Sequence, residues 1–321
     1  MQNKFSLIIP TLDRYLYLIN LLKEIETQTI TPDEIIIIDQ SVFTENKDLL
    51  NFLKSYKMRI NIKYVKLPPQ GSGKARNIAV SIASNEFLIF IDDDIEIRNP
   101  QLFENYLIHL NNENFNFVEG AYLDDPQRKI ERYLPDFKNP NIIFTLFSTY
   151  FNKNSNLRTV LGLCAGNFAC KKSKFVEIGG FDQRYGQSDD IDIGVRIFSS
   201  GYFIINDKNL RVFHYKAKSG GLRNNSKNSI WSSFLKFKPN KYFFAFFLKN
   251  FSKIQLIVYI YSLILNYLRF LNIKKILIFP GYLYLIIKSL IEGIKLNKST
   301  QKIYYQDYYE ELKNVNFLNF D

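Results

Sequence analysis

The sequence contains little cysteine and little histidine, with two of each in 321 residues. Cys164 and Cys170 have no companion cluster of Cys or His, so neither a zinc site nor a disulfide framework is indicated. The N-terminus enters an apolar run at Phe5 without the hydrophobic region and cleavage site of a signal peptide. A reducing, cytoplasmic environment fits these features best.

Acidic residues are nearly missing from one part of the chain. Residues 230–300 hold eleven Lys or Arg and one acid, Glu292, and so account for almost all of the net charge of +11. A nucleic-acid enzyme more often places its basic residues around the active cleft. We therefore expect no nucleic-acid partner.

The same basic stretch lacks an apolar run long enough to cross a membrane. The charge-free segments, between Lys253 and Arg269 and between Lys275 and Lys288, are shorter than the roughly 20 residues that a spanning helix needs. Aliphatic and aromatic faces flanked by lysines are typical of helices that lie on an anionic membrane surface. The alternative is a helical subdomain that packs on the rest of the chain or on another subunit, forming a homo-oligomer.

The first hundred residues alternate β-branched runs with helical periodicity, which predicts βαβ units and a parallel sheet. The expected elements are strands at Phe5–Pro10, Glu34–Asp39, Ile62–Leu67 and Phe87–Asp92, and helices at Tyr15–Glu26, Lys47–Tyr56 and Lys74–Ser84. Ligands of such sheets bind beyond the carboxyl ends of the strands.

The pattern becomes mixed after residue 99. We expect strands at Phe117–Leu123, Leu161–Cys170, Tyr202–Ile205 and Arg211–Tyr215, and a helix at Asp189–Ser200. Gly220 and Gly221 mark a boundary between a catalytic domain, residues 1–220, and a helical tail, residues 221–321.

Three consecutive carboxylates, Asp92, Asp93 and Asp94, follow an apolar strand. Grouped like charges repel one another, so their presence favours a bound cation. Mg²⁺ and Mn²⁺ suit such a site, because these ions bind a few carboxylates and complete their coordination with water and phosphate oxygens. The alternative is a solvated acidic turn.

A second acidic group, Asp189, Asp190 and Asp192, opens a helix. Acids at this position commonly cap a helix and offset its dipole, but a carboxylate here could also act as a general base. The positive end of the helix dipole is expected to keep the pKa of such a carboxylate low.

Gly71–Lys74 resembles a phosphate-binding P-loop only in part, because Pro68 and Ala75 stand at positions that such a loop fills with Gly and with Ser or Thr. What remains is a turn into a helix that carries Arg76 near its start. Donors at such a helix end suit a diphosphate. His214 ends a short strand and could be a ligand or a packed residue.

Together these motifs are similar to those of the inverting glycosyltransferases of family 2, whose nucleotide-sugar-binding fold is called GT-A. The similarity extends over about residues 4–216. The matching pieces are Ser6–Thr11, Glu34–Asp39, Gly73–Asn77, Phe90–Asp94, Ala165–Phe168, Gly179–Asp182, Ser188–Asp192 and His214. The resemblance implies an α/β domain with a mainly parallel central sheet.

The resemblance also implies roles for individual residues. The nucleotide or donor would contact Pro10, Thr11, Asp39, Arg76, Asp92 and Asp93. The acceptor or sugar pocket would include Gly166, Asn167 and Asp189, the last standing where the family has glutamate. Asp94 and His214 would bind the metal, and Asp190 would be the catalytic base. Gln40 and Ser41 depart from the family pattern, which leaves the nucleobase open.

The function implied is transfer of a sugar from a nucleoside-diphosphate sugar to a glycan or lipid-linked acceptor, with inversion, at the inner face of the cell membrane. The many Asn, Lys, Ile and Phe residues are typical of an A+T-rich bacterial genome, which fits an enzyme of surface-polysaccharide synthesis. Two alternatives remain on the residues alone: a nucleotidyltransferase, and a non-catalytic module that binds a membrane surface.

Overall fold

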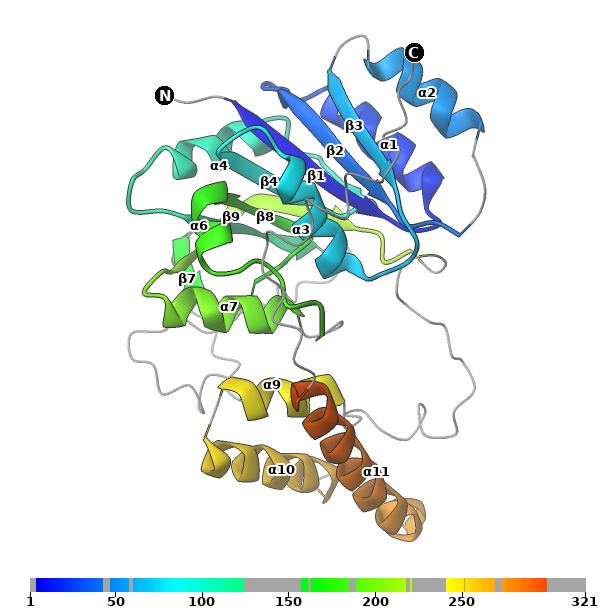
Figure 1. Cartoon of the computed structure of the whole chain (residues 1–321), viewed down its shortest axis with the longest axis vertical. Coiled ribbons are helices and arrows are strands. Elements are labelled where there is room, and N and C mark those ends of the chain that lie inside the picture. The colour runs from blue at the N-terminus through cyan, green and yellow to red at the C-terminus, as the bar shows by residue number, and fades with distance from the viewer. Residues whose placement is uncertain are drawn as a thin grey trace.

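A computed structural model gives the fold of the chain, shown in Figure 1. It describes residues 4–42, 47–57, 60–123, 157–160, 163–184, 189–217, 220, 241–250, 252–268 and 273–298.

The first part of the chain forms four parallel strands in the order β3-β2-β1-β4. The strands are β1 (Phe5–Thr11), β2 (Glu34–Asp39), β3 (Asn61–Lys66) and β4 (Phe87–Ile91), and the helices are α1 (Tyr15–Ile25), α2 (Lys47–Lys57) and α3 (Ser72–Ile82). Each element lies within two residues of its predicted bounds. The βαβ prediction for this region is confirmed.

Both faces of this parallel sheet are covered. Ile35 and Ile37 of β2 pack in one apolar cluster with residues of α1 and α2, whereas Ile36 and Ile38 pack in a second cluster with α3. Every residue of β2 is buried. Such burial on both sides is the reason that parallel strands are apolar throughout.

Further strands extend the sheet beyond β4 in the order β8-β6-β9-β5, and β7 pairs with β9. The strands are β5 (Ile95–Glu96), β6 (Phe117–Leu123), β7 (Leu157–Val160), β8 (Asn167–Lys171) and β9 (Ile204–His214), and the helices are α4 (Leu102–Leu110), α6 (Lys172–Glu177) and α7 (Asp189–Ser199). Strand β8 is antiparallel to both β4 and β6, whereas β9 is parallel to β6.

Two strand predictions in this part are wrong. The two short strands expected at Tyr202–Ile205 and Arg211–Tyr215 are one strand, β9, because it pairs with β6 on both sides of an irregularity between Gly120 and Tyr122. The strand expected from Leu161 begins only at Asn167, since Ala165 and Gly166 form a turn. Leu161 and Gly162 lie outside the described residues.

Three helices form the described part of the tail: α9 (Lys241–Asn250), α10 (Lys253–Leu268) and α11 (Ile273–Lys298). Figure 1 shows α9 between α7 and the two other helices. Val195 of α7 packs against Ala245, Phe246 and Phe247 of α9. The predicted boundary at residue 220 stays a prediction, because residues 221–240 lie outside the described residues.

A salt-bridge cluster also joins the tail to the rest of the chain. Lys249 Nζ lies 2.9 Å from Asp182 Oδ2 and 2.9 Å from Asp192 Oδ1. Arg184 pairs with Asp182 and Arg196 with Asp192.

Among the described helices, none has the length and apolar character to cross a membrane.

Candidate active site

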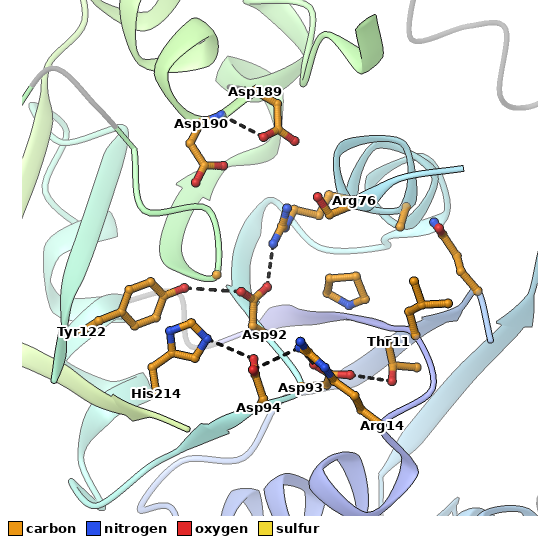
Figure 2. A pocket seen from close by; sticks show the side chains of 16 residues that line it. Thr11, Arg14, Arg76, Asp92, Asp93, Asp94, Tyr122, Asp189, Asp190 and His214 are labelled. Carbon is orange, nitrogen blue, oxygen red and sulfur yellow. Dashed lines mark hydrogen bonds and ion pairs between the residues drawn. The ribbon is translucent and has the colours of Figure 1, made fainter. Parts of the chain in front are cut away.

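A cavity of about 410 Å³ opens beyond the carboxyl ends of β1 and β4, and Figure 2 shows the side chains around it. Of the residues proposed from sequence, those lining it are Pro10, Thr11, Arg76, Asp92, Asp93, Asp94, Gly166, Asp189, Asp190 and His214. The structure thus brings the two acidic motifs, about a hundred residues apart in sequence, to one cavity.

The first carboxylate of the triple, Asp92, faces this cavity. Its Oδ1 accepts a hydrogen bond of 2.6 Å from Arg76, and its Oδ2 lies 3.5 Å from the hydroxyl of Tyr122. The backbone N–H of Asp92 donates to the carbonyl of Gly166, which holds the loop before β8 against the end of β4. Its side chain is 27% exposed and is therefore accessible to a ligand.

The second carboxylate, Asp93, turns back toward β1. It accepts hydrogen bonds from the hydroxyl of Thr11 at 2.7 Å and from Arg14 at 3.1 Å. Burial raises the pKa of Asp93 to about 7, even though the nearby Arg14 guanidinium opposes this shift. Its carboxylate ties the loop after β4 to the loop after β1.

The third carboxylate, Asp94, is surrounded by donors. Its Oδ1 lies 3.1 Å from Nε2 of His214, and its Oδ2 lies 3.0 Å from both Arg14 and the backbone N–H of Ala217. Burial by itself would raise the pKa of Asp94, but His214 and Arg14 outweigh it and lower the value to about 2. Asp94 is therefore ionised at neutral pH.

Sheet pairing explains how His214 reaches Asp94 across 120 positions of sequence. Ile95, the residue after Asp94, pairs directly with His214 where β5 runs antiparallel to β9. The ring of Tyr122 packs on the imidazole with centroids 4.6 Å apart and thereby restrains its orientation.

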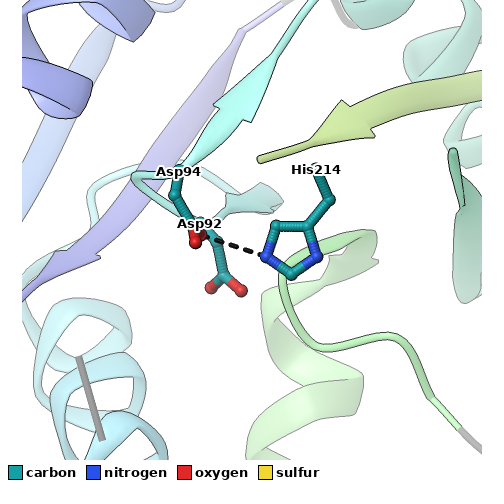
Figure 3. Close-up of side chains that lie close together, drawn as sticks. All are labelled: Asp92, Asp94 and His214. Carbon is teal, nitrogen blue, oxygen red and sulfur yellow. Dashed lines mark hydrogen bonds and ion pairs between the residues drawn. The ribbon is translucent and has the colours of Figure 1, made fainter. Parts of the chain in front are cut away.

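Asp92, Asp94 and His214 form a group that could hold a metal ion (Figure 3). One ligand atom from each lies within 4.8 Å of the others, in the part of the chain that the structure describes. The two carboxylates suit Mn²⁺ or Mg²⁺, and an imidazole is a common ligand of transition metals. The structure therefore places Asp92, which the resemblance had assigned to the nucleotide, beside Asp94 and His214 in a group that could hold a metal.

Arg76 separates the two acidic motifs. Figure 2 shows Arg76 and Asp92 between Asp94 and the pair formed by Asp189 and Asp190. Arg76 is only 4% exposed, and its Nε has no hydrogen-bond partner among the described residues. A buried guanidinium with a spare donor is suited to binding an anionic oxygen of a ligand.

Asp189 and Asp190 start α7 at the opposite wall of the cavity. Asp189 Oδ1 accepts a hydrogen bond of 3.1 Å from the backbone N–H of Asp190. Burial, followed by the negative charge of Asp189, raises the pKa of Asp190 well above its ordinary value, although Arg76 opposes this. The expectation that the helix N-terminus keeps this pKa low is wrong, because burial and the neighbouring carboxylate dominate.

Asp39 and Asn167 do not line the cavity, although both were proposed from sequence. The carboxylate of Asp39 is fully buried and accepts hydrogen bonds from Tyr64, from Tyr15 at 3.1 Å and from Lys66 at 3.1 Å. Asn167 is likewise buried, and its amide donates to the carbonyl of Leu210. Their neighbours Gln40 and Gly166 reach the cavity instead.

Sequence reasoning missed two lining residues that contact the acidic triple, Arg14 and Tyr122. Arg14 follows the carboxyl end of β1, so its position next to the expected site was a usable signal. Tyr122 is one of 21 tyrosines and had no such signal.

Known proteins share parts of this sequence and this fold. A family model described as Glycosyl transferase family 2 matches residues 6–179. Over 103 residues the chain is 31% identical to a poly(ribitol-phosphate) β-N-acetylglucosaminyltransferase, TarS, of Staphylococcus aureus, covering 31% of this chain and 18% of TarS.

A second relative is a GalNAc(5)-diNAcBac-PP-undecaprenol β-1,3-glucosyltransferase of Campylobacter jejuni. It is 29% identical over 129 residues, which cover 40% of this chain and 41% of the relative. The matches thus span less than half of either curated relative.

A solved structure shares the fold over most of the chain. It is the mannosyltransferase PcManGT of Pyrobaculum calidifontis in complex with GDP-Man and Mn²⁺, with a TM-score of 0.52 and 14% identity. The likeness covers 93% of this chain and 88% of that one. It confirms the predicted GT-A fold.

Proposed function

Because the chain belongs to glycosyl transferase family 2, we propose that it transfers a sugar from a nucleoside-diphosphate sugar to a hydroxyl group and inverts the anomeric carbon. The observation that carries this proposal is the cavity itself, where a buried arginine, Arg76, lies between a metal-binding group and a carboxylate of raised pKa, Asp190. The family match favours this reaction over the nucleotidyltransferase considered from sequence.

The donor diphosphate would lie beside Arg76 and the metal group. Arg76 lines the cavity beside the metal group, and Ser72 at the start of α3 lines the same cavity. Donors near a helix N-terminus favour phosphate oxygens. The bound GDP-Man of the mannosyltransferase supports a nucleotide sugar as donor, while the base and the sugar stay open.

A divalent ion, Mn²⁺ or Mg²⁺, would be held by Asp92, Asp94 and His214. When bound, such an ion offsets negative charge on a departing diphosphate. Arg14 contributes from the protein side, since its contacts with Asp93 and Asp94 keep the loop of the acidic triple in place.

The chemical step assigned to the protein is proton transfer to Asp190. Its carboxylate takes the proton of the acceptor hydroxyl while that oxygen bonds to the anomeric carbon. The bond from the anomeric carbon to the diphosphate breaks, and its electron pair leaves with the diphosphate. A raised pKa suits this role, because a base works best when its pKa lies near the working pH.

We propose that the acceptor is a glycan or a lipid-linked glycan. We also propose that the protein acts at the inner face of the cell membrane. The relative that acts on an undecaprenol-linked glycan supports this, as does the relative named for poly(ribitol-phosphate). We propose a role in bacterial surface-polysaccharide synthesis with the support of the same two relatives.

Paired variants test the proposal. We expect nucleoside diphosphates to raise the melting temperature of the wild type only with Mn²⁺ or Mg²⁺, and Asp94→Asn to abolish that shift. Asp190→Asn should keep the shift but lose sugar transfer by about 10²-fold or more. Asp48→Asn, an exposed charge on α2, is the matched control. Transfer at the wild-type rate by Asp190→Asn would show that another group is the base.

A further inference from the structure

Helices α10 and α11 each carry large apolar side chains that are about half or more exposed in the described structure. On α10 these are Ile254, Ile257 and Tyr261, which are 72%, 64% and 60% exposed. On α11 they are Tyr284, Ile287 and Ile291, which are 63%, 57% and 48% exposed. In both helices the spacing is i, i+3, i+7, so each set forms one narrow stripe along its helix.

The two stripes face away from the catalytic domain. The opposite sides of the helices are buried with Phe244 of α9, through Leu263 of α10 and through Tyr282 and Ile286 of α11. Helix α9 in turn packs on α7 (Figure 1). Surfaces that point away from α9 therefore lie on the far side of the tail from the active site.

Positive charge borders these stripes. Lys295 and Lys298 are exposed and continue the α11 stripe at four and seven residues beyond Ile291. Lys253 and Lys288 are also exposed, and Glu292 is the only acid in residues 230–300. Two copies of so basic a tail would repel each other, whereas an anionic surface would attract both the lysines and the apolar stripe between them.

We propose that the stripes of α10 and α11 dock this protein on the surface of an anionic lipid bilayer, with the isoleucines and tyrosines entering the headgroup region and the lysines contacting lipid phosphates. The inference rests on the membrane location proposed above, but not on the transfer reaction.

Sedimentation of the full chain with vesicles tests this. Wild-type protein should bind phosphatidylglycerol-containing vesicles, bind phosphatidylcholine vesicles much less, and lose affinity as salt is raised. Ile257→Ser with Ile287→Ser should weaken binding at least tenfold. Lys295→Gln with Lys298→Gln should weaken it on anionic vesicles only, by about fivefold for each lysine. Ile108→Ser, an equally exposed isoleucine on α4, should have no effect.

Several results would overturn the proposal: no binding by the wild type, equal binding to neutral vesicles, or stripe variants that bind like the wild type. A stripe variant that instead converts a dimer to a monomer would assign the face to a second copy of the chain. The metal-dependent melting shift with nucleoside diphosphate separates the two proposals. Vesicle binding without the melting shift refutes the proposed function alone. A melting shift without vesicle binding refutes the docking face alone.

Discussion

Replacement of Gly166 by alanine tests the arrangement of the site more sharply than removal of a charge. A Cβ at position 166 would lie well inside 3.0 Å of both Asp92 Oδ2 and the hydroxyl of Tyr122, a separation that real Cβ atoms essentially never show. Asp92 cannot yield freely, because its other oxygen is bound to Arg76 at 2.6 Å. The methyl group must therefore displace a proposed metal ligand or the tyrosine that packs on His214.

The size of the effect follows from the size of this displacement. Restoring ordinary contact requires a movement on the order of 1 Å, and misplacement by that distance can lower an enzymatic rate about 10²-fold. The cost in folding is smaller, about 1–3 kcal/mol, which is usual for an overpacked site. We therefore expect Gly166→Ala to fold, to bind nucleoside diphosphate with Mn²⁺ more weakly, and to lose about 10²-fold in kcat/KM.

The assay is release of nucleoside diphosphate from the donor sugar, with a melting curve for each variant. Gly201→Ala is the control, because an added Cβ there meets open space, although this glycine, unlike Gly166, has a positive φ of 82°. The left-handed conformation costs alanine about 1–2 kcal/mol. Gly201→Ala should therefore lose stability and keep its kcat/KM. Wild-type turnover in Gly166→Ala would refute the view that the position of Asp92 matters for the reaction.

Three further predictions concern charge. Lys249→Met removes the lysine that pairs with Asp182 and Asp192 and leaves each carboxylate with one arginine. A broken buried ion pair costs about 3–5 kcal/mol. Because the lysine is 24% exposed, we expect a smaller loss in the free energy of unfolding, about 1–3 kcal/mol. Burial by itself would raise the pKa of Asp182, but Arg184 and Lys249 lower it to about 2. The stability that this carboxylate adds is therefore present above about pH 4 and is lost as the pH falls toward 2. Urea unfolding between pH 7 and pH 2 measures both effects. Equal stability of Lys249→Met and wild type at neutral pH would contradict the first, and no loss of wild-type stability below pH 4 would contradict the second. For catalysis, Asp190 must be deprotonated to accept a proton and its pKa is raised, so kcat/KM should begin to fall at a pH well above the usual 3.9 of an aspartate as acid is added. A pH profile that stays flat down to about pH 4 would contradict the base assignment.

The sequence by itself determined the family and the fold, and it proposed the place of the site. Continuous apolar strands such as β2 alternate with helical periodicity over the first hundred residues, and that pattern depends on local propensity and burial alone. Motif order then identified the residues of both acidic groups. The confirmed parts of the prediction are the family, the fold and the βαβ elements, while the roles of the acidic residues stay a prediction.

Only the tertiary structure decided how those residues act together. His214 meets Asp94 because β5 pairs with β9, and neither strand is recognisable as a partner of the other from its own residues. Tyr122 reaches the site through the same sheet, and the pKa of Asp190 depends on burial and on Asp189, which overrode the local effect of the helix end. Packing also gives adjacent residues different surroundings. Asp39 is buried away from the cavity, whereas the next residue, Gln40, lines it. Strand pairing and burial are properties of the packed chain, and a single sequence carries no direct measure of either.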